Sequence, residues 1–439
     1  MYQPLSKNLG SKNEELLSLT VRAFTAITKL DADILKSKID SIVQSVSPIL
    51  LKGMGDEKSA ITSQQSTLKA DICSLYQTLT GHLSLASVDT TRSLVGSILR
   101  VCSSNTFKLS AIAFGVLSCM IETLFKPDDS MDVDYSEQER AIIAIIESEL
   151  VSCIDSISSF DFECQEQLLA CLGIFVAYVG DSLKESNIRN AFMTVLFEKV
   201  AFEATRFCAI KSLRMIFQSP LLARDTFKSC LKDFVPSTIP SLTNLIKSSS
   251  TKSKDEVVAV LGDLLLSGPY IPAETAISLS RLVTENLPSL EGLGIIGSFA
   301  VLEFAIKLQN NKITEEHLTS CLPQVVKLIQ TSSASLVSKG CISSLKGYVH
   351  SLASVSPQVK VQVIQAFVVL VDSIEDISEK ACKEALQMTA EAIASACIAG
   401  SSIEFSVLDG LLSKGSAPHE YTALKALTNA GKSMYVFFT

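Results

Sequence analysis

Three glycines, Gly292, Gly294 and Gly297, come closest in type and spacing to a chemical signature. The order G-x-G-x-x-G is typical of dinucleotide-binding turns, in which a strand leads into the first glycine and a helix follows. Residues 277–287, which precede this motif, have the apolar spacing of a helix that ends at Pro288, so the strand is missing. We predict that the glycines form the turn before a helix containing Ala300 and allow close packing, without binding a nucleotide.

An acidic segment at residues 128–139 is spaced similarly to a calcium-binding loop. Acidic residues stand at positions 1, 5, 7 and 12 of this segment, and Ser130 and Ser136 stand at positions 3 and 9. Calcium prefers six to eight such oxygen ligands. However, Val133 occupies the position that needs glycine for a sharp turn, and a β-branched residue resists that geometry. We therefore predict a solvated acidic loop.

Histidine and cysteine residues show no spacing typical of a metal site. The chain has four widely separated histidines, His82, His317, His350 and His419. Its twelve cysteines contain no C-x-x-C pair, and several lie in apolar runs, namely Cys73, Cys119, Cys171, Cys208 and Cys341. A free thiol in such a run behaves as a small apolar side chain. We predict reduced thiols, no catalytic residue, no metal ligand and no cofactor, and therefore no enzyme.

The charge and hydropathy of the chain exclude other classes of function. The chain has 38 Lys and Arg against 46 Asp and Glu, a formal net charge of −8, and it has no basic cluster for binding DNA or RNA. Its longest apolar run, residues 168–179, is shorter than the roughly 20 residues that span a bilayer. We expect a cytoplasmic protein with no nucleic-acid partner and no transmembrane segment, recruited to endosome or Golgi membranes through its protein partners.

Helices that repeat about every forty residues are the elements that must position these side chains. Hydrophobic residues make up 47% of the chain and aromatic residues only 6%, so the core must be built from aliphatic side chains. Apolar helical segments align on a recurring small residue, at Ala26, Ala70, Ala111, Ala170, Ala209, Ala259, Ala300, Cys341, Ala385 and Ala423. A small side chain there lets neighbouring helices approach to the usual distance of about 8–10 Å.

Each of these segments follows a first helix and a short polar turn. Residues 234–246 and 321–329 have apolar residues at helical spacing after Pro236 and Pro323, which we place near the first turn of each first helix. Residues 187–217 show the same organisation, with a turn at 200–203 between two helices. The repeating unit is therefore a helical hairpin.

This unit, with proline near the first helix and a basic residue ahead of the second-helix alanine, resembles the HEAT repeat. Arg206 precedes Ala209, and Lys339 precedes Cys341, where that family usually carries Arg or Lys; the usual turn Asp is largely replaced by Ser. The resemblance implies an all-α, right-handed α-solenoid of about ten helical hairpins, of the HEAT or armadillo-like type.

We predict that residues 1–439 form one continuous solenoid, because each hairpin buries its apolar face against its neighbours. An acidic loop at about 126–139, a Ser- and Lys-rich loop at about 247–256 and a third loop at 53–65 interrupt the pattern. The apolar end at residues 434–438 is a poor cap for a solenoid. This leads us to expect part of a longer array or an end covered by a partner.

A solenoid presents a long curved surface that suits extended peptides or helices of other proteins. We therefore expect a non-catalytic protein-binding scaffold or adaptor. The Ser-rich, Asp-poor turns loosely resemble the giant HEAT-repeat proteins that assist clathrin adaptor complexes, which implies vesicle traffic between endosome and Golgi. The alternatives are an importin-β-like nuclear transport receptor and a HEAT-type regulatory subunit of a kinase, a phosphatase or a translation factor.

Overall fold

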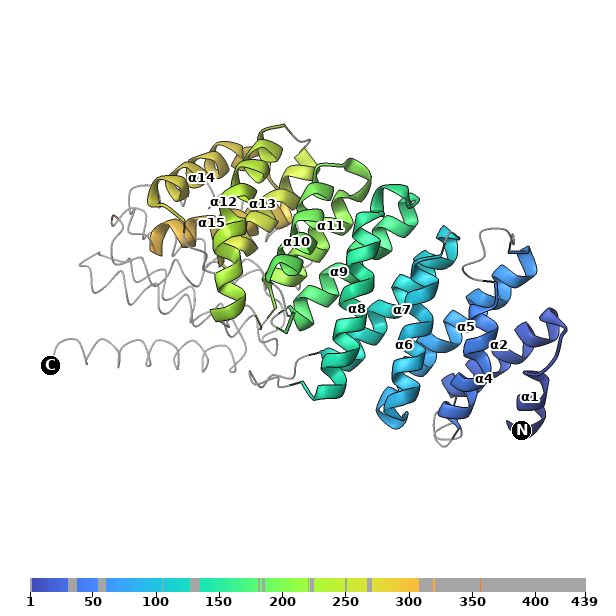
Figure 1. Cartoon of the computed structure of the whole chain (residues 1–439). Helices are drawn as coiled ribbons and strands as arrows, with labels where there is room; N and C mark the ends of the chain where they lie inside the picture. Colours follow the sequence, from blue (N-terminus) through green and yellow to red (C-terminus); the bar gives the residue numbers. More distant parts are fainter. Residues whose placement is uncertain are drawn as a thin grey trace, which may run out of the picture. The chain divides into compact units, whose positions relative to one another are not determined.

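The computed structural model describes most of the first 307 residues of the chain (Figure 1). It covers residues 2–307 except 31–37, 54–60, 105, 127–134, 181, 184–185, 220, 222–224, 249–250 and 267–270, and it adds the single residues Thr319 and Ser356. The chain divides into two compact units, Met1–Cys230 and Leu231–Thr439. The single continuous solenoid over 1–439 stays a prediction, and Cys341, Ala385 and Ala423 lie outside the described residues.

Helices make up the described part of both units, and the described residues contain no strand. The first unit contains α1 (Tyr2–Asn8), α2 (Glu14–Leu30), α4 (Ile39–Leu51), α5 (Ser63–Thr80), α6 (Val88–Cys102), α7 (Phe107–Phe125), α8 (Glu137–Asp155), α9 (Phe162–Val179), α10 (Ser186–Val200) and α11 (Glu203–Phe217). The unit boundary falls within α12 (Asp225–Ser248), and the second unit continues with α13 (Thr251–Leu266), α14 (Ala273–Asn286) and α15 (Gly292–Lys307). Short 3-10 helices precede α6, α9 and α15.

The helices of the first unit form hairpins that stack in two layers (Figure 1). One layer is the row of second helices, in which α2 packs on α5, α5 on α7, α7 on α9, and α9 on α11. The other layer is the row of first helices, in which α4 packs on α6, α6 on α8, and α8 on α10. In the second unit α15 packs on both α13 and α14. The prediction of an all-α stack of helical hairpins is confirmed.

Polar side chains at the helix N-termini explain where several helices begin. Thr62 and Gln65 form a capping box at α5, and Ser136 and Glu139 form one at α8. The Asp161 carboxylate accepts a hydrogen bond from the Cys164 N–H at α9. Each of these side chains satisfies a backbone N–H that has no partner within its own helix.

The core of the stack is aliphatic, with a few large rings. Phe24, Tyr76, Phe114, Phe125 and Phe175 are fully buried among Leu, Ile and Val side chains. Burial of this apolar surface is the dominant favourable contribution to folding. The composition correctly predicted an aliphatic core.

The recurring small residues lie on the second helices, although they do not share one position in the packing. Ala111, Ala209, Ala259 and Ala300 are buried in α7, α11, α13 and α15. By contrast, Ala70 and Ala170 are half-buried and Ala26 is exposed on α2. The sequence alignment therefore located each described second helix correctly, but its helical phase was correct for only some of them.

Two predictions about local structure are wrong. The predicted Ser- and Lys-rich loop at 247–256 is largely helical, because α12 ends at Ser248 and α13 begins at Thr251. Pro236 lies inside α12, which begins at Asp225, and not in a first turn. The apolar spacing after Pro236 therefore marks the later part of a longer helix.

The helices α7 and α9 are long and apolar enough, by length and composition alone, to cross a membrane. Each of them packs between neighbours in the second-helix layer, α7 between α5 and α9, and α9 between α7 and α11. Core helices of this kind are apolar on most sides. The absence of a transmembrane segment stays a prediction from the sequence.

Candidate functional site

Gly294 and Gly297 of the G-x-G-x-x-G motif lie at a helix–helix contact, whereas Gly292 has open space around its Cβ direction. All three glycines lie in the first turns of α15 and not in a turn before it, which corrects the predicted position. Gly292 has a positive φ of 42°, and a Cβ on Gly297 would lie 2.4 Å from the Val258 carbonyl oxygen of α13. Gly262 of α13 faces Gly297 in the same contact. The predicted close packing is confirmed.

The N-terminus of α15 faces a carboxylate. The Glu291 N–H donates to the Asp255 carboxylate of α13 at 2.7 Å, and a Cβ on Gly294 would meet that same side chain. Burial raises the pKa of Asp255 to about 6, against the lowering effect of the Glu291 N–H. A carboxylate at this point would repel a phosphate group.

Ser136 and Glu139 of the calcium-like segment bond to each other. The Glu139 N–H donates to Ser136 Oγ at 3.3 Å, and the Glu139 carboxylate accepts from the Ser136 N–H at 2.8 Å. These are capping contacts at the start of α8. Residues 127–134, which complete the predicted acidic loop, lie outside the described residues.

The described part of the chain holds no group of three or more His, Cys, Asp or Glu side chains placed to bind a metal. It includes His82, whereas His317, His350 and His419 lie outside the described residues. Of the cysteines singled out above, Cys73 and Cys171 are buried, Cys119 and Cys208 are half-buried, and Cys341 lies outside the described residues. Burial raises the pKa of both the Cys73 and Cys171 thiols to about 12. Protonated thiols of this kind are poor nucleophiles.

Two basic side chains of second helices cap the first helix of their own hairpin. Arg206 of α11 donates from Nε to the Val200 carbonyl at the end of α10, at 2.9 Å. Lys69 of α5 donates from Nζ to the Leu50 carbonyl and to the Lys52 carbonyl, the latter at 2.8 Å, at the end of α4. A cation at a helix C-terminus satisfies carbonyls that have no helical partner.

Sequence reasoning identified Arg206 as the basic residue of the repeat but missed Lys69. Lys69 immediately precedes Ala70, so the rule that singled out Arg206 and Lys339 would have found it. In the hairpin between α6 and α7, Ser110 takes this place and donates to the Val101 carbonyl at 3.1 Å. Lys339 lies outside the described residues. These polar residues are therefore structural, and they leave other surfaces as candidates for binding.

A cleft of about 710 Å³ lies where α2, α4 and α5 meet in the first unit. Its apolar lining includes Leu17, Pro48 and Leu68, and its charged lining includes Lys12 and Lys52. Clefts with apolar walls and a few charged groups commonly bind small ligands or side chains of a partner.

A second candidate surface, which we call the aromatic end, consists of Phe162, Phe202 and Phe207. These side chains are large and exposed, Phe207 by 66%. They lie at the N-terminal ends of α9 and α11, two helices joined by the hydrogen bond from Ser212 Oγ to the Leu169 carbonyl at 2.9 Å. Large exposed aromatic side chains are typical of protein-interaction sites.

Comparison with solved structures shows the class of fold. Yeast importin-β (Kap95p) has a TM-score of 0.63 at 14% identity, covering 99% of this chain and 52% of that one. A structure of the Kap95:Nup1 complex has a TM-score of 0.54 at 14% identity, covering 98% of this chain and 57% of that one. An engineered protein has a TM-score of 0.52 at 16% identity, covering 98% of both chains.

The chain thus has the HEAT-type helical-repeat fold, as the sequence predicted. It spans about half the length of the importin-β chain to which it is similar. No sequence-family model and no curated protein sequence matches it.

Proposed function

We propose that the protein is a non-catalytic protein-binding scaffold. The aromatic end supports this proposal most directly, because Phe162, Phe202 and Phe207 expose apolar surface that a partner would cover. Within the chain, the Lys199 ammonium lies 5.5 Å from the centre of the Phe202 ring. Aromatic side chains on rigid helices are typical anchors of a protein interface. In the similar Kap95:Nup1 complex, a protein of this fold is bound to another protein.

Affinity purification of a double variant, Phe202→Ser with Phe207→Ser, tests this function. Both side chains are largely exposed, so the variant should fold, while the partner should lose its apolar contacts. We expect co-purified partners to fall by about tenfold or more relative to the unchanged chain. The matched control is Ile145→Ser, an exposed apolar residue on α8 of the other layer. Equal recovery from all three proteins would contradict the aromatic end as the interface.

We further propose vesicle traffic as the cellular process, with the protein in the cytoplasm and recruited to endosome or Golgi membranes by its partners. The Ser-rich, Asp-poor turns support this reading. An importin-β-like receptor and a kinase, phosphatase or translation-factor subunit are the alternatives. Clathrin adaptor subunits among the partners would support the first reading, a small GTPase with nuclear cargo the second, and a stoichiometric kinase or phosphatase the third.

A further inference from the structure

The outer face of α2 carries apolar side chains at the spacing of a coiled-coil seam. Leu16, Leu19, Ala23, Ala26 and Leu30 follow one another at alternating steps of three and four residues. This 3-4 spacing places all five on one side of a helix. We call them the α2 stripe.

The α2 stripe lies on the solvent side of the helix. Leu16 is 39% exposed, Leu19 is 56% exposed and Leu30 is 87% exposed, although the neighbouring helix α1 packs on α2. Ala26 is also exposed, and Ala23 is half-buried. Several large apolar side chains in water along one helix face are unusual for a helix that needs only one buried face.

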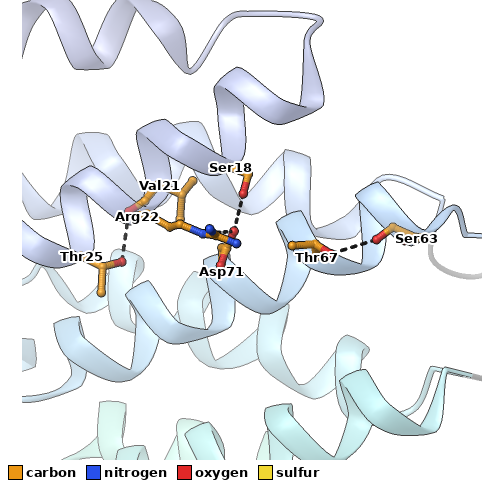
Figure 2. A network of polar contacts seen from close by, with 7 residues as sticks. All are labelled: Ser18, Val21, Arg22, Thr25, Ser63, Thr67 and Asp71. Carbon is orange, nitrogen blue, oxygen red and sulfur yellow. Dashed lines mark hydrogen bonds and ion pairs between the residues drawn. The ribbon is translucent and has the colours of Figure 1, made fainter.

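The opposite face of α2 is buried in the first unit. Leu17, Val21 and Phe24 are buried there, beside three threonines. The Thr25 hydroxyl donates a hydrogen bond to the Val21 carbonyl (Figure 2), and the Thr28 hydroxyl donates one to the Phe24 carbonyl. The buried face is thus complete without the stripe, which is free to contact another helix.

Polar contacts fix the orientation of α2 on α5. Arg22 Nε donates to the Asp71 carboxylate at 2.9 Å, and Ser18 donates to the same carboxylate (Figure 2). The Arg22 side chain is still 57% exposed. These bonds hold the stripe facing outward, so that it is preorganised for a partner.

The charges beside the stripe specify the partner. The flanking residues at seven-residue spacing are the acidic Glu15, the basic Arg22, which already pairs with Asp71 of α5, and the basic Lys29. In paired helices such flanking positions select a partner with opposite charges. We propose that the α2 stripe binds an amphipathic α-helix of a partner protein, one with apolar residues at 3-4 spacing and acidic residues on its flanks. The proposal rests on the scaffold function and names one kind of partner for it.

A designed peptide tests this proposal with the full chain. The probe is a three-heptad helix with Leu at its a and d positions and Glu at its e and g positions, whose acidic flanks prevent it from pairing with itself. Fluorescence anisotropy should show saturable binding to the unchanged chain. Leu19→Glu should weaken that binding by about tenfold or more, because it puts a charge at the centre of the seam and repels the probe.

Leu266→Glu is the matched control, because Leu266 on α13 is 48% exposed and the substitution changes the charge equally. It should bind the peptide like the unchanged chain. A second peptide with Lys at the flanks should bind about tenfold more weakly than the acidic one. Equal binding of the acidic peptide to Leu19→Glu, or no binding to any form, would overturn the proposal.

Analytical sedimentation of the chain alone tests whether a second copy of the chain, and not a partner helix, occupies the stripe. If the chain self-associates through the stripe, Leu19→Glu would abolish that association while the peptide would not bind, and the proposed partner helix would be wrong. The proposal for the stripe and the proposed scaffold function can also be tested separately. Cellular partners recovered unchanged with Leu19→Glu, yet lost with Phe202→Ser and Phe207→Ser, would leave the scaffold function standing without the stripe.

Discussion

Single polar residues act at the hairpin ends, where helix carbonyls and N–H groups need partners. Lys69 is the clearest example, because it is buried and its ammonium group donates hydrogen bonds to carbonyls at the C-terminal end of α4. Burial of this group lowers the pKa of Lys69. The same chemistry at Arg206 explains the basic residue of the repeat without any ligand.

Lys69→Met should destabilise the first unit. The substitution keeps the length of the side chain but leaves the Leu50 and Lys52 carbonyls without their donor. We expect a loss of about 1–3 kcal/mol in the free energy of unfolding, measured by urea denaturation. Lys108→Met, at an exposed position on α7, is the control and should change stability by no more than about 0.5 kcal/mol. Equal losses in the two variants would contradict the capping role.

Asp255→Asn should stabilise the second unit at neutral pH. The folded-state pKa of about 6 exceeds the ordinary value of 3.8, so the favourable contribution is complete below about pH 4 and is lost as pH rises through 6. Asparagine keeps an acceptor for the Glu291 N–H without the charge. We expect a gain of up to about 1 kcal/mol at pH 7, since the half-exposed carboxyl is screened by solvent, and none at pH 4. Thermal melts at both values measure it, and an equal gain at both would contradict the assignment.

At the scale of the helices, small residues allow neighbouring second helices to approach each other closely. In the first unit, a Cβ on Gly173 of α9 would lie 2.5 Å from the Cβ of Ser212 on α11. Gly262 and Gly297 make the corresponding contact in the second unit. Real Cβ atoms do not approach this closely, so these helices pack through backbone and glycine.

Gly297→Ala should destabilise the contact between α13 and α15. The new methyl group would meet the Val258 carbonyl at 2.4 Å, so the two helices must separate. We expect a loss of about 1–3 kcal/mol, measured by chemical denaturation.

Gly96→Ala is the control for that substitution. Gly96 lies in α6 with open space around its Cβ direction, so the better helix propensity of alanine should stabilise the protein by up to about 1 kcal/mol. Destabilisation by both changes would show that helix geometry, and not contact, sets the effect.

The sequence predicted the hairpins well because apolar periodicity depends on local spacing. Residues 187–217 gave two helices and a turn close to where α10 and α11 lie, and residues 277–287 gave most of α14. The sequence predictions failed where the same residue pattern is compatible with two different local structures. The serines and lysines of 251–256 resemble a loop, yet they lie on the first turns of α13, and the glycines of 292–297 resemble a phosphate turn, yet they lie in α15.

The candidate surfaces were less predictable, because exposure depends on which neighbours cover a helix. Phe207 and Leu19 stand in apolar segments that look like core. Only the packing of α9 on α11 and of α2 on α5 shows that these side chains face solvent. The 3-4 spacing of the α2 stripe was visible in the sequence, although its outward direction was not.

At the scale of the whole molecule, a stack of hairpins should respond locally to damage, because each hairpin contacts only its neighbours. Gly173→Ala should therefore speed amide hydrogen exchange in α9 and α11, where Ser212 must move. Exchange in α13 and α15 of the second unit should stay unchanged. Hydrogen exchange read by mass spectrometry measures both, and equal acceleration in the two units would contradict a locally stabilised repeat.

The central claim is that the protein acts by binding other proteins. Affinity purification of the full chain from its native cells, with crosslinking read by mass spectrometry, tests this claim most directly. The account predicts near-stoichiometric protein partners crosslinked close to the aromatic end or the α2 stripe. Recovery of the chain without any stoichiometric protein partner, together with turnover of a small substrate by the purified chain, would contradict it.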